Sequence, residues 1–396
     1  MSAKAPYMAH EADVEKLKNH WSAVLGGETR TVQLTGALGA GKRALVGEIC
    51  RNAIADAEDD VLIWRLHVRE EDDGMQVVLR AYATLFAGVQ RSPAFRGKVE
   101  MALNSQIPNQ PKRVQGWYQS FIEGLRKATP GADGKVQVNL PKDNPLVGLI
   151  EIASGIARKF PVILDINGLH NSHSVGFMAF LESLFREAKQ GGRLLTVLSM
   201  EPLDDVSKTW MSQPMQDLFD RGGDTLHMMP MTPWTGVEVE KYLSSRNIEA
   251  NAAKVAEIAA GRPGFVAELI DYLKENDRLG SDITEMTLAT LVDLAPDASE
   301  LEAPKEPAKE GERKYASAND AERIAHLAAL LGVSFPSGLL ADMGGFVRDS
   351  VDDIMDATED VYKELQFSEP LGTWVYQFKR ALIRESVLAR HTGDEA

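Results

Sequence analysis

The chain has 396 residues, of which 44% are hydrophobic, so it is long enough for two or three domains with cores of their own. Its 43 Lys and Arg residues stand against 58 Asp and Glu residues, which gives a formal net charge of -15. A surface this negative repels phosphate backbones and anionic lipids over most of its area. Any contact with nucleic acid therefore has to be local.

The only cysteine, Cys50, lies in an apolar helical pattern, which excludes an intramolecular disulfide framework and fits a reducing compartment. The most apolar run, residues 146–157, is too short to cross a bilayer and contains Glu151. No N-terminal stretch has the basic start and apolar core of a signal peptide. We therefore expect a cytoplasmic protein that does not contact membranes.

The first half of the chain alternates predicted strands and helices. A helix over 10–25 ends at Gly26-Gly27, and a strand over 31–35 leads into a glycine-rich loop and a further helix. More strands are predicted at 61–68, 162–166 and 194–199, and more helices at 77–86 and 177–188. Strands rich in Val, Ile and Leu that alternate with helices indicate an α/β domain with a buried parallel sheet. Residues 130–145 are turn-rich and predict a loop or small hairpin.

The second half is mainly helical. Three short amphipathic helices after Met228 predict a helical lid, and residues 293–313, rich in Ala, Pro, Glu and Lys, predict a solvated linker. From Ala316 onward, three helical stripes, an apolar strand over 374–378 and a closing helix over 381–389 predict a winged-helix domain.

Residues 36–43, GALGAGKR, have the spacing of a Walker A phosphate loop except at the last position. Gly36, Gly39, Ala40 and Gly41 let backbone N–H groups face phosphates, and Lys42 supplies charge to the β and γ oxygens.

Arg43 stands where that pattern has a Ser or Thr hydroxyl that ligates Mg²⁺. Two interpretations stay open. Either Arg43 points into solvent and the metal site is simply weakened, or its guanidinium neutralises a phosphate in place of the metal.

Several segments resemble the signal-transduction ATPases with numerous domains (STAND) and the related origin-recognition-like AAA+ ATPases. Residues 8–17 (MAHEADVEKL) look like the entry motif of that group, with His10 in place of its Arg. Residues 261–269 (GRPGFVAEL) are similar to its Gly-x-Pro lid element, and residues 376–385 (YQFKRALIRE) to its winged-helix signature. The resemblance implies a P-loop core that binds ATP or ADP, with Pro263 near the adenine.

The segment PVILDINGLH, residues 161–170, fits the Walker B pattern of this group in two registers. In one register, Asn167 and Gly168 replace both acidic residues. In the other, Asp165 keeps the metal-binding role and is the candidate catalytic acid, but Ile166 replaces the catalytic Glu. We favour the first register because it preserves the strand length and the Leu-His pair. Neither register supplies a general base.

Glu201 follows the strand over 194–199, where relatives often carry a polar sensor residue and an Arg, and a carboxylate there would repel a γ-phosphate. Arg43, the altered Walker B segment and Glu201 all oppose Mg²⁺-dependent hydrolysis, so together they predict a pseudo-ATPase. His170 and His173 lack further ligands at suitable spacing, and we predict no metal site.

The sequence thus predicts an N-terminal helix leading into the core (1–27), a parallel-sheet P-loop NTPase core (28–227), a helical lid (228–292), an acidic Pro-rich linker (293–315) and a winged-helix domain (316–396). We expect a nucleotide-binding regulatory or scaffold protein that acts through protein partners and can self-associate. An active ATPase switch and a winged-helix DNA-binding regulator are the alternatives. The basic residues Lys379, Arg380, Arg384, Arg390 and His391 support DNA binding, and the net charge opposes it.

Overall fold

The computed structural model describes residues 10–57, 60–69, 74–127, 144–169, 175–188, 192–201, 213–221, 226–276, 278–279, 283–296, 313–358 and 360–391. These residues form two compact units, which meet in the sequence between Thr232 and Pro233. The first is called the core unit here and the second the C-terminal unit. Residues 130–143 of the predicted turn-rich segment, most of the predicted linker, and both His170 and His173 lie outside the described residues.

The core unit is built on a parallel sheet with the strand order β2-β3-β4-β1-β5. Its strands are β1 (Arg30–Thr35), β2 (Leu62–His67), β3 (Val162–Asn167), β4 (Leu194–Met200) and β5 (His227–Pro230). Every residue of β4 is buried, as expected for a strand covered on both faces. The parallel sheet predicted from the apolar runs is confirmed.

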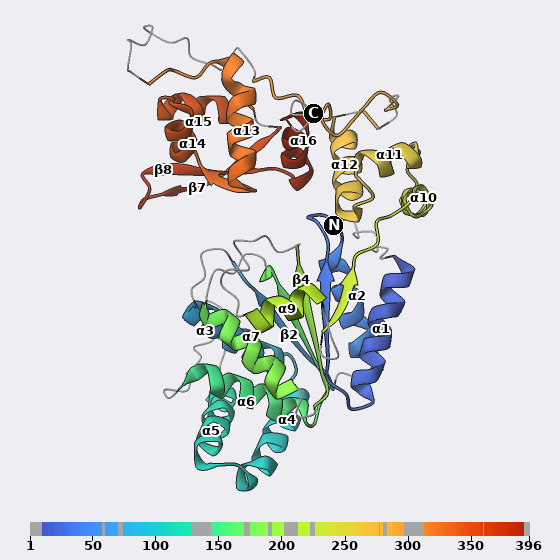
Figure 1. The fold of residues 1–396 in the computed structure, drawn as a ribbon, viewed down its shortest axis with the longest axis vertical. Helices are drawn as coiled ribbons and strands as arrows, with labels where there is room; N and C mark the ends of the chain where they lie inside the picture. Colours follow the sequence, from blue (N-terminus) through green and yellow to red (C-terminus); the bar gives the residue numbers. More distant parts are fainter. Residues whose placement is uncertain are drawn as a thin grey trace. The chain divides into compact units, whose positions relative to one another are not determined.

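Helices cover both faces of this sheet (Figure 1). One face packs against α1 (Glu11–Leu25) and α2 (Lys42–Asp56), through side chains such as Leu17, Trp21 and Leu45. The other face packs against a larger helical layer, which consists of α3 (Gly74–Gln90), α4 (Pro93–Gln106), α5 (Lys112–Lys127), α6 (Pro145–Ala157), α7 (Val175–Ala188) and α9 (Gln213–Arg221). The helices α4 and α5 were not predicted.

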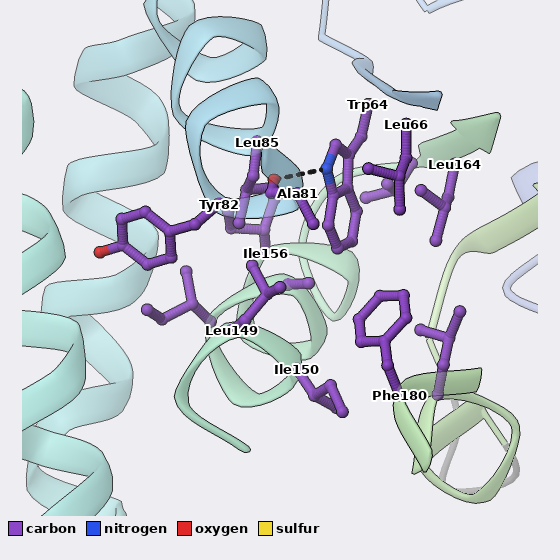
Figure 2. Packing of buried hydrophobic residues seen from close by; sticks show 14 of the residues in the cluster. Trp64, Leu66, Ala81, Tyr82, Leu85, Leu149, Ile150, Ile156, Leu164 and Phe180 are labelled. Carbon is purple, nitrogen blue, oxygen red and sulfur yellow. Dashed lines mark hydrogen bonds between the residues drawn. The ribbon is translucent and has the colours of Figure 1, made fainter. Parts of the chain in front are cut away.

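Figure 2 shows how α3 and α6 pack on β2 in that larger layer. Trp64 is fully buried, and its indole Nε1 donates hydrogen bonds to the Ala81 carbonyl (2.9 Å) and to Thr84 Oγ1 (3.2 Å). Tyr82 and Ile156 belong to the same buried cluster. The single polar atom of this large side chain is therefore satisfied inside the core.

The C-terminal unit contains the predicted lid helices and winged helix. The lid helices are α10 (Gly236–Ser245), α11 (Ala252–Ile258) and α12 (Pro263–Glu275). The winged helix comprises α13 (Ala321–Leu331), β6 (Ser334–Pro336), α14 (Ser337–Gly344), α15 (Arg348–Asp356), β7 (Tyr362–Ser368), β8 (Thr373–Phe378) and α16 (Ala381–His391). Its sheet is antiparallel with the order β6-β8-β7. The predicted fold class, a P-loop α/β core with a helical lid and a winged helix, is confirmed.

Among the described helices, none has both the length and the apolar character that a membrane span requires.

At Gly88, near the end of α3, the helix lies so close to β2 that a side chain would not fit. A Cβ there would lie 2.7 Å from the Ile63 carbonyl oxygen and 2.9 Å from Leu62 Cδ1. We expect Gly88→Ala to lower the free energy of unfolding by about 1–3 kcal/mol, since strand backbone cannot yield cheaply. Urea denaturation followed by circular dichroism measures the change.

The matched control is Gly97→Ala in α4, where an added Cβ meets no atom within 4 Å. This variant should gain roughly 0.5–1 kcal/mol because alanine favours the helix. A Gly88→Ala protein as stable as the Gly97→Ala protein would contradict the close packing.

Candidate functional site

The glycine-rich loop between β1 and α2 is fixed at its start by both neighbouring strands. Gly36 N donates to the Met200 carbonyl at the end of β4 (3.2 Å), and Met231 N, just after β5, donates to the Thr35 carbonyl (2.8 Å). A Cβ on Gly36 would lie 2.9 Å from Ala40 Cβ and 3.1 Å from Met231 Cβ. Position 36 therefore has no room for a side chain.

The loop ends in an arrangement suited to an anion. Gly39 (φ 81°) and Gly41 (φ 90°) both adopt left-handed conformations that favour glycine. Gly41 is the N-cap of α2, and among the described residues no side chain caps this helix. The backbone N–H groups and the positive end of the helix dipole therefore face the loop, as in phosphate-binding sites.

Lys42, the first residue of α2, turns back over the loop. Its Nζ donates hydrogen bonds to the carbonyls of Gly36 and Ala37, the latter at 3.0 Å. Partial burial lowers the pKa of Lys42, the nearby Glu201 carboxylate opposes this effect, and Arg43 adds to it. The structure thus brings together the predicted loop residues, Lys42 and Glu201.

Arg43 is exposed, yet its charge acts at the ends of two strands. Burial is the main cause that lowers the pKa of His67, at the end of β2, and the Arg43 guanidinium lowers it further. Arg43 also opposes the burial-driven rise of the Asp165 pKa in β3. The positive charge of Arg43 therefore affects ionisable groups in the last residues of β2 and β3, next to the phosphate loop.

The two Walker B candidates lie at different distances from the loop. Asn167 is the last residue of β3 and is level with Ser199 of β4 and Leu34 of β1, two residues before Gly36. Asp165 is one side-chain repeat earlier, about 7 Å further from the loop along the strand. Gly168 follows Asn167 and donates its N–H to the Ser199 carbonyl (3.1 Å).

Asp165 lies in a mostly apolar sheet beside positive charge. Burial raises its pKa to about 6, against the effect of Arg65, which is level with it on β2, and of Arg43. Its Oδ1 is buried and has no hydrogen-bond partner among the described residues. Cys50, on α2, is buried as expected, and its thiol forms a hydrogen bond with Arg65.

Two residues of this region, Arg65 and Ser199, were not predicted from the sequence. Arg65 has a detectable signal, because a charged residue interrupts the apolar strand VLIWRLHV. Ser199 has no such signal in the sequence. Its Oγ is buried without a hydrogen-bond partner among the described residues, and strand pairing places it level with Asn167.

Asp13, in the segment that resembles an entry motif, was also not singled out. Its side chain is fully buried and accepts hydrogen bonds from Thr232 N and Thr232 Oγ1, both at 3.0 Å. This carboxylate therefore fixes α1 to the last residue of the core unit.

Pro263 is the buried first residue of α12 in the C-terminal unit, and its predicted place near an adenine stays a prediction. The preceding residue, Arg262, lies 4.9 Å from the Phe265 ring centroid and pairs with Glu385 of α16 (3.1 Å). Glu268 of α12 accepts a hydrogen bond from Leu382 N in α16 (2.8 Å). The lid and the winged helix are thus joined by polar contacts between α12 and α16.

The basic residues near the C-terminus take part in similar contacts. Arg380 pairs with Glu275 of α12. Arg384 Nε donates to the Ala329 carbonyl and Arg390 Nε to the Ala289 carbonyl, both at 2.8 Å. Three of the five predicted basic residues therefore bind other parts of the C-terminal unit.

Comparison of the fold with solved structures finds several similar chains. The Aeropyrum pernix ORC1 protein, solved in complex with DNA, is 12% identical, with a TM-score of 0.41 over 99% of this chain and 95% of that chain. The Aeropyrum pernix ORC2 protein in its ADP form is 11% identical, with a TM-score of 0.39 over 100% and 97% of the two chains. A Thermotoga maritima RuvB variant is 15% identical, with a TM-score of 0.36 over 93% and 92%.

No protein-family model matches the sequence, and no curated protein matches it. The function therefore has to be inferred from the chain's own residues.

The raised pKa of Asp165 predicts a pH-dependent stability. The folded pKa of about 6 exceeds the ordinary aspartate pKa of 3.8, so the native state holds this proton more tightly than the unfolded chain does. The stabilisation is present at low pH and is lost as the pH rises from about 4 to about 6. We expect Asp165→Asn, which cannot ionise, to raise the free energy of unfolding at pH 7 by roughly 1–2 kcal/mol, allowing for partial exposure.

Urea titrations of both proteins between pH 4 and pH 8 test this. The difference should vanish near pH 4 and grow toward pH 7. Asp56→Asn, an exposed change at the end of α2, controls for the loss of one acidic charge. A constant or inverted difference for Asp165→Asn would contradict the assignment.

Proposed function

We propose that this chain is a nucleotide-binding protein of AAA+/STAND type that binds ADP or ATP at residues 36–43 without needing Mg²⁺ and hydrolyses it little or not at all. The observation that carries the proposal is the pairing of an intact phosphate loop with Arg43 at the metal-ligand position. The glycine conformations, the uncapped start of α2 and the inward-turned Lys42 support phosphate binding.

Arg43 supports the metal-independent form of this proposal. A guanidinium cannot ligate a cation, but it can bind a phosphate through paired N–H groups. Its charge already acts on His67, at the end of β2 beside the loop, and on Asp165, two residues before the end of β3. A nucleotide in this loop would therefore meet positive charge at a place where related sites hold a metal ion.

The donor atoms near the loop fit Mg²⁺ poorly. The ion prefers six oxygen ligands in octahedral geometry and uses carboxylates, hydroxyls and phosphates. Here the position for the hydroxyl is Arg43, and the strand end nearest the loop offers the Asn167 amide. No cluster of three or more His, Cys, Asp or Glu side chains in the described part of the chain could hold a metal ion.

The same geometry supports weak hydrolysis. A general base must lie within hydrogen-bond reach of the attacking water. Gly168 follows Asn167 and has no side chain, whereas Asp165 lies one repeat deeper with a buried oxygen. The alternative of an active ATPase switch would need Asp165 to act over this distance, so it is less well supported.

The DNA-binding alternative is also less well supported. In a helix-turn-helix the second helix enters the major groove, and here that helix is α15. It carries a single basic residue, Arg348, together with the acidic residues Asp349, Asp352, Asp353 and Asp356. Arg380, Arg384 and Arg390 contact other parts of the C-terminal unit itself. A regulatory or scaffold role through protein partners fits this negative surface better, and a cytoplasmic location and self-association remain part of the proposal.

Calorimetric titration of ADP and ATP, in Mg²⁺ and then in EDTA, tests nucleotide binding. We expect micromolar dissociation constants that change less than about threefold between the two buffers. Arg43→Thr should weaken binding in EDTA by at least tenfold, equivalent to about 1.4 kcal/mol, because it removes the charge that stands in for the metal.

Lys42→Ala is the control that removes phosphate binding itself, so neither nucleotide should bind it. An absence of binding to the wild-type protein in both buffers would sink the proposal. Mg²⁺-dependent ATP turnover that Lys42→Ala abolishes would leave binding intact but refute weak hydrolysis.

Anisotropy of a labelled DNA duplex tests the winged helix. We expect no measurable binding at about 50 mM salt, where phosphate contacts are strongest. Binding that weakens at about 200 mM salt and disappears in Lys379→Glu/Arg380→Glu, but not in the exposed control Lys112→Glu, would instead favour the DNA-binding alternative.

A further inference from the structure

Glu201 occupies a defined position beside the phosphate loop. It is the residue after Met200, which is level with Thr35 across β4 and β1 and accepts the hydrogen bond from Gly36 N (3.2 Å). The chain therefore leaves β4 next to the first residue of the loop. Glu201 is half-buried at this corner of the site.

The same corner holds the ammonium group of Lys42. Lys42 Nζ contacts the carbonyls of Gly36 and Ala37, and the Glu201 charge acts on this ammonium. A negative group thus lies near the lysine that, in a phosphate loop, reaches the β and γ oxygens. Part of the positive charge that a γ-phosphate would require is already balanced.

The phosphates of a nucleotide meet different parts of this loop. Backbone N–H groups of the loop and the start of α2 hold the α and β phosphates, whereas a γ-phosphate extends toward Lys42. A diphosphate is held by these N–H groups and by Lys42 at its β oxygens, and it places no further charge beside Glu201. A triphosphate must also place a charged oxygen group beside a carboxylate, in a partly buried place where repulsion is weakly screened.

We propose that Glu201 makes this site selective for a nucleoside diphosphate over the corresponding triphosphate. The inference rests on the proposed nucleotide binding and adds which phosphate chain the site accepts. Repulsion by Glu201 sets the selectivity, so it requires no hydrolysis and no metal ion. A protein of this kind would hold ADP as its resting ligand even in an excess of ATP.

The test is calorimetric titration of the full chain with ADP and ATP in EDTA, so that no divalent cation masks the phosphate charges. Wild-type protein should bind ADP at least tenfold more tightly than ATP, and Glu201→Gln should reduce this ratio to less than about threefold by strengthening ATP binding. Pyrophosphate and tripolyphosphate should show the same pattern, which excludes any contribution of the base.

Two further variants keep the test decisive. Glu201→Asp retains the charge and should keep the preference for ADP, whereas Glu15→Gln removes an exposed acidic charge on α1 and should leave the ratio unchanged. Thermal unfolding confirms that each variant folds.

Three outcomes would overturn the inference. Equal binding of ADP and ATP to the wild-type protein would show that there is no selectivity. A preference for ADP that persists in Glu201→Gln would show that another group sets it. If neither nucleotide binds wild-type protein or Glu201→Gln, the proposed function itself fails, and this result is distinct from the first two.

Discussion

The close packing at Gly36 is the constraint on which the site depends. A side chain there would strike Ala40 and Met231, and the Gly36 N–H is held by the Met200 carbonyl. Because the first residue of the loop is fixed by two strands, the residues that follow those strands are fixed as well. Glu201 follows Met200 on one side. On the other, Met231 leads to Thr232, which Asp13 binds at the end of the core unit. The loop and the exit from the core unit are therefore parts of one hydrogen-bonded arrangement, and Glu201 directly follows one of its residues.

Charge is distributed unevenly around this loop. Lys42 and Arg43 begin α2, and Arg65 lies on β2, level with Asp165. Two carboxylates lie near these three cations. Asp165 has a buried oxygen without a hydrogen-bond partner in the described residues, and Glu201 lies beside Lys42. Burial makes the charged form of Asp165 costly, so it compensates the arginines only in part. The region keeps a surplus of positive charge that an anionic ligand can satisfy.

Most of the fold could be predicted from the sequence, because apolar runs and glycine-rich turns are local signals. The buried strand β4 and the phosphate loop are examples. The helices α4 and α5 were missed, although their apolar residues are buried in the core, because no loop motif or strand marks their limits. The site was harder to predict. The positions of Asn167 and Asp165 relative to the loop, and the closeness of Glu201 to Lys42, depend on strand register, which one sequence does not reveal.

Arg43, the altered Walker B segment and Glu201 affect different steps of nucleotide binding and hydrolysis, and the effect of each depends on the others. Loss of a general base alone would leave a site that still binds a metal-bound triphosphate, because Mg²⁺ needs only the hydroxyl and the phosphate oxygens. In the proposed function, Arg43 removes that option while keeping a positive charge for the phosphates. If no metal ion is bound, the Glu201 carboxylate is not screened from the nucleotide by such an ion. The resulting electrostatic repulsion then acts on the γ-phosphate alone. In the proposed function, Lys42 and the loop glycines bind phosphate, whereas hydrolysis would need a general base, which neither Asn167 nor Gly168 supplies.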